Sequence, residues 1–183
     1  MCGLTMMIRL ASKRDLDAVM SVEKEAFGEE AEAHLVRDLM GDPTAEPRYA
    51  FIAFEKDQAI GHVLFTAVRL EGATSGLSLS ILAPLAVIPE FQKQGVGGRL
   101  IAHGVSHLAK EGVALVFVLG HPDYYPRHGF TPAGEKGFEA PYPILEKNAG
   151  AWMVKALKPG VIGTVSGRVK CAAVMDHPEY WRE

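Results

Sequence analysis

The sequence predicts an α/β fold, in which strands and amphipathic helices alternate along the chain. Apolar runs rich in branched residues, typical of strands, recur between residues 7 and 157. Over residues 96–108, apolar side chains instead recur three to five positions apart, which is the spacing of one helix face. A loop with three glycines joins this helix to the strand before it. With 183 residues, of which 48% are hydrophobic, the chain can bury one sizeable core.

The N-terminal half is predicted to contain a strand, two helices and a hairpin. Ser12, followed three positions later by Asp15, resembles a helix N-cap with an acid in the first turn. A polar link at residues 55–58 separates two apolar runs, which predicts antiparallel strands joined as a hairpin. The predicted elements are a strand at 7–10, a helix that starts at Ser12, a helix at 30–40, and strands at 49–54 and 59–68.

The C-terminal half is predicted to add three more strands. They are expected at residues 79–88, 113–119 and 152–157. Pro84 lies within the first of them, and a proline in a strand favours an edge or a bulge because it has no N–H to donate. Residues 163–170 alternate weakly, and residues 176–181 are typical of a surface turn.

The glycine loop, residues 92–98, is typical of a phosphate-binding site. At a helix start several N–H groups lack partners and the helix dipole is positive, and glycines leave those amides open to a ligand. A Walker A loop does not fit, because Arg99 and Leu100 stand where it needs Lys followed by Ser or Thr. A dinucleotide fingerprint fits poorly, since Leu100 replaces its third glycine.

Two motifs resemble the GNAT superfamily of N-acetyltransferases. The first, Gln92-x-x-Gly95-x-Gly97, resembles the acyl-CoA-binding motif that follows the fourth strand and opens the third helix of that family. For this loop alone, an ordinary strand–turn–helix with glycines for tight packing is the alternative. The second motif, residues 124–130, resembles the family's aromatic-Tyr-x-x-x-Gly-Phe segment. The resemblance covers residues 7–157 and is closest to a bacterial group of uncharacterised members that share a Leu-Gly-x-Pro-x-Tyr-Tyr segment.

The resemblance implies a GNAT domain over residues 7–157, with residues 158–183 as a C-terminal extension packed on it. The implied fold is a mixed, mostly antiparallel central sheet, flanked by helices and splayed between the fourth and fifth strands. The implied activity is transfer of an acyl group from acetyl-CoA, without a metal, to the primary amine of a small molecule or a protein. The alternative is a non-catalytic acyl-CoA-binding sensor or interaction domain.

The resemblance also assigns roles to individual residues. Tyr125, four positions before Gly129, stands where the family has the general acid that protonates the departing thiolate, and packing against pantetheine is its alternative role. The backbone amide of Val87 would stabilise the thioester oxygen. Lys93 and Arg99 are either solvated charges or phosphate contacts. The implied CoA-binding residues are Leu85, Ala86 and Val87 beside the pantetheine arm, and Gln92, Lys93, Gln94, Gly95, Val96, Gly97 and Gly98 around the pyrophosphate.

No general base is evident in the sequence. His62 is a candidate, although a histidine in a strand is more often a packing residue. His121, Asp123 and His128 are metal-ligand types, but prolines break their spacing, so no metal site is expected. A run of glutamates in the early helices is interpreted as a solvated face: Glu23, Glu25, Glu29, Glu30 and Glu32.

Composition excludes several classes of function. The net charge is −3 without a clustered basic excess, so no nucleic-acid partner is expected. No apolar run approaches the ~20 residues of a membrane helix, and the N-terminus lacks the basic region of a signal peptide. Because Cys2 and Cys171 lie far apart and no export signal is evident, we expect free thiols and a cytoplasmic protein. The sequence is compatible with a homodimer but does not fix the oligomeric state.

Overall fold

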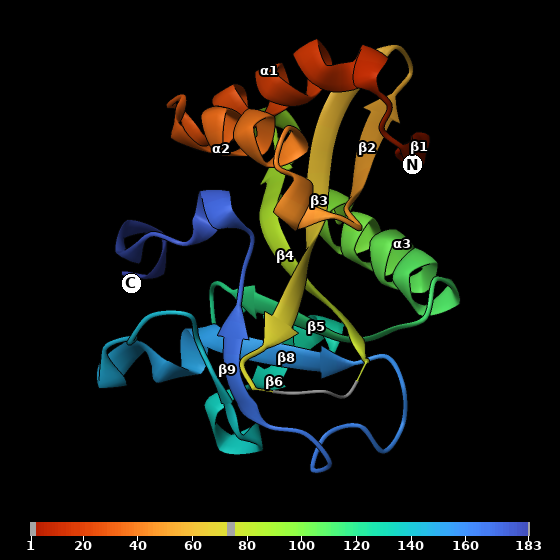
Figure 1. Ribbon diagram of the computed structural model, residues 1–183. Coiled ribbons are helices and arrows are strands. Elements are labelled where there is room, and N and C mark those ends of the chain that lie inside the picture. Colours follow the sequence, from red (N-terminus) through yellow and green to blue (C-terminus); the bar gives the residue numbers. More distant parts are fainter. Residues whose placement is uncertain (1–2, 73–75, 183) are drawn as a thin grey trace.

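A nine-stranded mixed sheet forms the centre of the fold (Figure 1). The computed structural model describes residues 3–72 and 76–182. Strands follow the order β1-β2-β3-β4-β5-β8-β6, and β9 pairs with both β3 and β7. Neighbouring strands are antiparallel except for the pairs β4–β5 and β7–β9. The strands are β1 (Met6–Leu10), β2 (Tyr49–Glu55), β3 (Gln58–Leu70), β4 (Ser78–Val87), β5 (Val113–Leu119), β6 (Thr131–Pro132), β7 (Phe138–Glu139), β8 (Trp152–Ala156) and β9 (Gly167–Lys170).

Three α-helices flank this sheet in the part of the chain that the structure describes. They are α1 (Leu16–Phe27), α2 (Ala31–Met40) and α3 (Val96–Lys110). Gly61 of β3 lies against Leu100 of α3, whereas the next residue, His62, contacts Glu23 of α1. Successive strand residues point to opposite faces, so α1 and α3 cover opposite faces of the sheet. The predicted mixed, mostly antiparallel sheet with flanking helices is thus confirmed.

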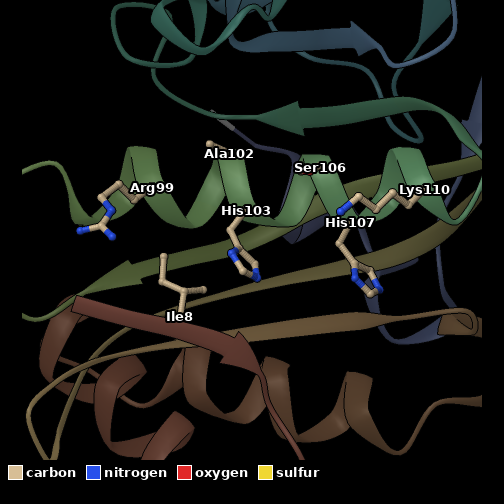
Figure 2. A pocket seen from close by; sticks show the side chains of 7 residues that line it. All are labelled: Ile8, Arg99, Ala102, His103, Ser106, His107 and Lys110. Carbon is tan, nitrogen blue, oxygen red and sulfur yellow. The ribbon is translucent and has the colours of Figure 1, made fainter. Parts of the chain in front are cut away.

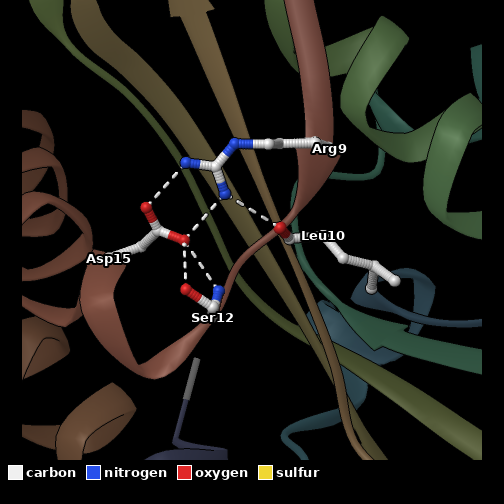
Figure 3. Close-up of polar contacts among 4 residues, drawn as sticks. All are labelled: Arg9, Leu10, Ser12 and Asp15. Atoms are coloured by element: carbon white, nitrogen blue, oxygen red, sulfur yellow. Dashed lines mark hydrogen bonds and ion pairs between the residues drawn. The ribbon is translucent and has the colours of Figure 1, made fainter.

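The predicted N-cap, Ser12, begins a 3₁₀ turn at Lys13–Asp15 that leads directly into α1 (Figure 3). The Asp15 carboxylate accepts hydrogen bonds from the Ser12 amide at 2.7 Å and from the Ser12 hydroxyl at 3.2 Å. It also accepts two from the Arg9 guanidinium, at 2.7 and 2.8 Å, and Arg9 donates further to the Leu10 carbonyl. Arg9, and then Ser12, hold the pKa of Asp15 well below its usual range, because these bonds favour the ionised carboxylate.

Two hydrophobic cores fill the two faces of the sheet. Gly104 of α3 lies where an added Cβ would overlap the Phe65 ring, so that helix packs closely on β3. The core under α1 and α2 includes Val19, Val36, Leu39, Leu64 and Phe117. The core under α3 includes Val63, Phe65, Leu100, Ile101 and Val116.

Strands β4 and β5 separate part-way along the sheet. Their parallel pairing runs from Ser78 to Ile81 of β4 and ends there among the described residues. Beyond Ile81, β4 keeps its pairing with β3, with a shift in register at Pro84 and the residue before it. As predicted, Pro84 lies at an irregularity in the strand. The last part of β4 therefore has a strand neighbour on its β3 side and an open edge toward β5.

The chain after β8 crosses back over the sheet through β9 and ends beside α2 (Figure 1). There the Ala173 amide donates to the Thr44 hydroxyl at 2.8 Å. Trp181 is 1% exposed, and its ring packs edge-on against Trp152 with centroids 5.9 Å apart. The prediction of a surface turn at residues 176–181 is therefore wrong for Trp181, because the indole completes the core under α2.

Candidate active site

The glycine loop turns the chain from β4 into α3. One turn of 3₁₀-helix, Pro89–Phe91, follows β4. Helix α3 begins after Gly95, whose φ of 85° is a left-handed conformation that glycine adopts without strain. Lys93 is left-handed as well, with φ 61°. The Gln92 side chain folds back and donates to the Val87 carbonyl at 2.9 Å, so a residue of the motif itself ties the loop to the end of β4.

A cavity of about 890 Å³ lies where the end of β4, the glycine loop and the tyrosine segment after β5 meet. The two sequence motifs, far apart in the chain, therefore share one cavity. Its lining residues are Leu85, Val87, Phe91, Gln92, Lys93, Gly95, Val96, Gly97, Gly98, His121, Tyr124, Tyr125, Arg127 and His128.

Two of the predicted site residues do not line this cavity. Ala86 is buried and stands opposite His62 in the β3–β4 register. Strand alternation sends its side chain to the α1 face while Leu85 and Val87 line the cavity. The Gln94 side chain donates to the Glu90 carbonyl within the loop, at 2.9 Å. A contact from Ala86 or Gln94 to a ligand in this cavity would therefore come from the backbone.

Gly97 and Gly98 let the tyrosine segment pack against the first turn of α3. Added Cβ atoms at these positions would lie 2.5 Å from the Tyr124 hydroxyl oxygen and 2.8 Å from His128 Cε1. The structure thus shows the packing role that the sequence left open as an alternative. Burial raises the pKa of Tyr124. Burial, followed by nearby cations, lowers the pKa of His128 and so favours its neutral imidazole.

Tyr125 lies in the wall of the cavity, with 8% of its surface exposed. Its ring packs edge-on against Tyr124 and Phe130, with centroids 5.1 and 5.6 Å apart. It also covers Gly120, where an added Cβ would overlap the ring. Packing on several sides therefore fixes the orientation of this side chain.

A second groove, of about 570 Å³, lies between β1 and α3 and is separate from the cavity of the glycine loop (Figure 2). Arg99 lies in this groove, whereas Lys93 lines the cavity of the loop. His103 and His107 pack edge-on against Phe51, with centroids 5.2 and 5.4 Å apart. The residues lining the groove are Ile8, Arg99, Ala102, His103, Ser106, His107 and Lys110.

The glutamates of the early helices are not one solvated face. Glu25, Glu29 and Glu30 are exposed, as predicted. Glu23, in contrast, is fully buried, and its Oε1 lies 2.5 Å from Nδ1 of His62, which is also fully buried. The prediction of a solvated face is therefore wrong for Glu23.

The sequence held a signal for the burial of Glu23. It follows Val19 by four positions, so it lies on the apolar stripe that faces the sheet. Burial raises the pKa of Glu23 and so does the nearby Glu32 charge, while the hydrogen bond with His62 acts in the opposite direction. The structure therefore places a carboxylate–imidazole pair beneath α1.

Residues 3–72 and 76–182 also bear on the predictions about metals, membranes and thiols. No group of three or more His, Cys, Asp or Glu side chains in these ranges is arranged to hold a metal ion. None of the helices described there is long and apolar enough to cross a membrane. Cys171 is a free thiol, and burial raises its pKa to about 11; Cys2 lies outside the described residues.

Comparison with known families adds an independent identification. The family model described as an acetyltransferase (GNAT) domain matches residues 7–133. The chain belongs to the GNAT family. Two curated relatives from Escherichia coli K12 carry the name uncharacterized N-acetyltransferase. YjhQ is 46% identical over 164 residues, covering 89% of this chain and 90% of its own. YhbS is 31% identical over 166 residues, covering 90% of this chain and 95% of its own.

Solved structures of GNAT proteins share this fold. The crystal structure of E. coli YhbS in complex with CoA has a TM-score of 0.86 and 28% identity, covering 96% of this chain and 94% of that one. A GNAT acetyltransferase from Brucella melitensis in complex with acetyl-CoA has a TM-score of 0.74 and 26% identity, covering 94% of this chain and 99% of that one. The family resemblance, the fold class and the N-acetyltransferase class predicted from the sequence are thereby confirmed.

Proposed function

We propose that this GNAT protein transfers the acetyl group of acetyl-CoA to the primary amine of a small molecule or a protein. The observation that carries the proposal is the single cavity that the glycine loop, the end of β4 and Tyr125 share. The structural relatives from E. coli and B. melitensis were crystallised with CoA and acetyl-CoA, which supports an acyl-CoA as the donor substrate.

The same cavity offers complementary surfaces to the two ends of such a donor. The amides of residues 93–98, at the positive N-terminal end of α3, would hold the pyrophosphate. The β4 edge from Leu85 to Val87 lies where β4 has left β5. Its backbone groups can pair with the amides of a pantetheine arm, as an added strand would.

Transfer requires one bond to form and one to break at the thioester carbon. The amine nitrogen attacks this carbon, and the Val87 amide would stabilise the oxygen as it gains negative charge. The C–S bond then breaks, and the Tyr125 hydroxyl would give its proton to the departing thiolate. A phenol remains protonated at neutral pH, since its ordinary pKa is about 10.

The proposal is tested by thiol release from acetyl-CoA across a panel of amines. Tyr125→Phe should lower kcat by ~10²-fold or more, while CoA affinity measured by calorimetry stays unchanged. The matched control is Tyr142→Phe, because the exposed Tyr142 hydroxyl donates to Asp176 and lies outside the cavity. Turnover of Tyr125→Phe at the wild-type rate would assign Tyr125 a packing role. CoA binding without thiol release for any amine would favour the sensor alternative.

A further inference from the structure

Acyl transfer to an amine needs a group that accepts a proton, because an ammonium nitrogen has no lone pair with which to attack. Strand β4, which borders the split in the sheet, carries no ionisable side chain among Ser78–Val87. Within the cavity, His128 packs against Gly98 at the phosphate end of the glycine loop. His121 is exposed. The base is therefore to be sought on the other side of β4.

The buried pair Glu23–His62 lies on that side. Both side chains have 0% exposure, and Glu23 Oε1 lies 2.5 Å from His62 Nδ1. Among the described residues, His62 Nε2 and Glu23 Oε2 are buried without a hydrogen-bond partner, and so is Oε2 of Glu32 on α2. A buried ionisable pair carries a desolvation cost that apolar packing would avoid. Unsatisfied buried groups call for an explanation, and a catalytic role is one that suits an acid–imidazole pair.

The register of the sheet places the pair beside the end of β4, where the transfer is proposed to occur. His62 stands directly opposite Ala86 of β4, and Gly61 stands opposite Val87. Residues opposite each other in an antiparallel pair share a face, so the side chain beside the imidazole on the β4 side is the methyl group of Ala86. Strand spacing is about 4.8 Å. The imidazole is therefore one strand away from the edge of β4, on the face of the sheet opposite to the Leu85 and Val87 side chains.

The other elements around His62 leave it with acidic and apolar neighbours. Glu23 comes from α1 and Glu32 from α2, and the two carboxylates interact electrostatically. On the β2 side, His62 stands opposite Ile52. No cation among these neighbours competes for the Nε2 lone pair.

We propose that His62, positioned by Glu23, accepts the proton that the acceptor ammonium must lose before it attacks the thioester. When a carboxylate holds Nδ1–H, the neutral ring carries its lone pair on Nε2. Nε2 takes one proton from R–NH₃⁺, leaving R–NH₂ and an imidazolium that Glu23 stabilises. Of the two protons that the ammonium loses overall, one passes to solvent through this pair. The other replaces the proton that Tyr125 gives to the CoA thiolate.

Glu32 extends the inference to the class of acceptor. It is partly exposed with its Oε2 buried, whereas Glu23 is fully buried, so Glu32 is the more solvent-accessible of the two acids. A carboxylate in this position attracts a cationic amine. This assignment rests on the proposed transferase function.

The pH dependence of thiol release tests the inference with a matched pair of variants. His62→Gln should lower kcat at neutral pH by ~10²–10³-fold, with unchanged CoA affinity. The rate of thiol release by His62→Gln should rise about tenfold per pH unit, because the free amine replaces the ammonium as the pH increases. Glu23→Gln should lower kcat less than His62→Gln does, and it should change the pH profile in the same way. His177→Gln, an exposed histidine of the C-terminal segment that lines neither the cavity nor the groove, should behave as wild type. A His62→Gln variant with wild-type kcat and pH profile would overturn the inference.

A measurement on the wild type remains available if the His62 variant does not fold. Nitrogen-15 NMR of histidine-labelled protein should show the neutral His62 ring with its proton on Nδ1, and a proton on Nε2 would overturn the assignment. A wild type that binds acetyl-CoA but releases thiol with no amine would overturn the transferase proposal and this inference with it. Turnover that is indifferent to His62→Gln would overturn this inference alone.

Discussion

Helix α1 is associated with two carboxylates that are shielded from solvent in different ways. Asp15, at its start, accepts bonds from Arg9 and Ser12. Glu23, further along, has one partner, His62, and a second oxygen that is buried without a partner among the described residues. The pKa of Asp15 is lowered, whereas that of Glu23 is raised. One local environment favours the charged carboxylate and the other opposes it.

The difference separates a structural carboxylate from one that is suited to chemistry. At Asp15 the Arg9 guanidinium and the amide and hydroxyl of Ser12 replace the water that burial removes, so the charge supports the start of the helix. At Glu23 burial is compensated by one imidazole. Perturbed ionisable groups of this second kind gather at functional sites, where stability is given up for a useful protonation state. The contrast between Asp15 and Glu23 can be tested by substitution at each.

The largest effect is expected for Glu23→Leu. This change leaves His62 buried without its hydrogen-bond partner, which should cost ~3–5 kcal/mol of the free energy of unfolding. Urea denaturation at neutral pH measures it. The matched control is the double variant Glu23→Leu/His62→Leu, which removes both polar groups and should recover most of the lost stability. It should also lack transferase activity. A single variant as stable as wild type would show that the pair is not coupled as the structure indicates.

A smaller effect is expected for Asp15→Asn. The amide keeps the size of the carboxylate but loses its charge and one acceptor oxygen, so the bonds from Arg9 and Ser12 weaken. The expected loss at neutral pH is ~1–2 kcal/mol, reduced because Arg9 is largely exposed. Thermal or urea denaturation checks it, with Asp17→Asn, an exposed carboxylate on the same helix, as the control. A loss equal to that of Asp17→Asn would show that the cap does not stabilise α1.

The two carboxylates should also give opposite slopes of stability against pH. The lowered pKa of Asp15 means that its contribution is present above its unfolded value of ~3.9 and is lost as the pH falls toward the folded value. The stability gap between wild type and Asp15→Asn should therefore narrow in acid. The raised pKa of Glu23 means that its contribution is present below ~4.3 and is lost as the pH rises. The stability of Glu23→Gln relative to wild type should therefore increase as the pH rises toward neutrality.

Urea denaturation of the three proteins from about pH 3.5 to pH 7 distinguishes these slopes. Parallel curves for Asp15→Asn and Glu23→Gln would contradict the comparison, since they would place both carboxylates in equivalent environments. The double variant of Glu23 and His62 serves as a reference here as well. It lacks both groups of the pair, so its curve should differ from that of wild type wherever the pair titrates.

Local patterns in the sequence predicted most of the fold, because strand and helix periods are local signals. The glycine loop and the tyrosine segment were also predictable, since their residue types are set by backbone conformation and close packing. The burial of Glu23 was not predicted, because a run of acidic residues indicated a solvated face even though Glu23 lies on the apolar stripe of α1. The pairing of β9 with β3 and the burial of Trp181 depend on contacts between distant parts of the chain, which no local pattern encodes.

The smallest effect is expected beside Glu23, at Lys24. Its Nζ lies 2.7 Å from the Glu30 carboxylate, nearly the same separation as in the pair Glu23–His62. Lys24 and Glu30 are 61% and 57% exposed, so water and salt screen their attraction and both side chains lose freedom by pairing. Lys24→Ala should therefore leave the midpoint of urea denaturation unchanged, at low salt and at high salt. A loss comparable to that of Asp15→Asn would mean that distance, rather than burial and the number of partners, sets the contribution of these charges.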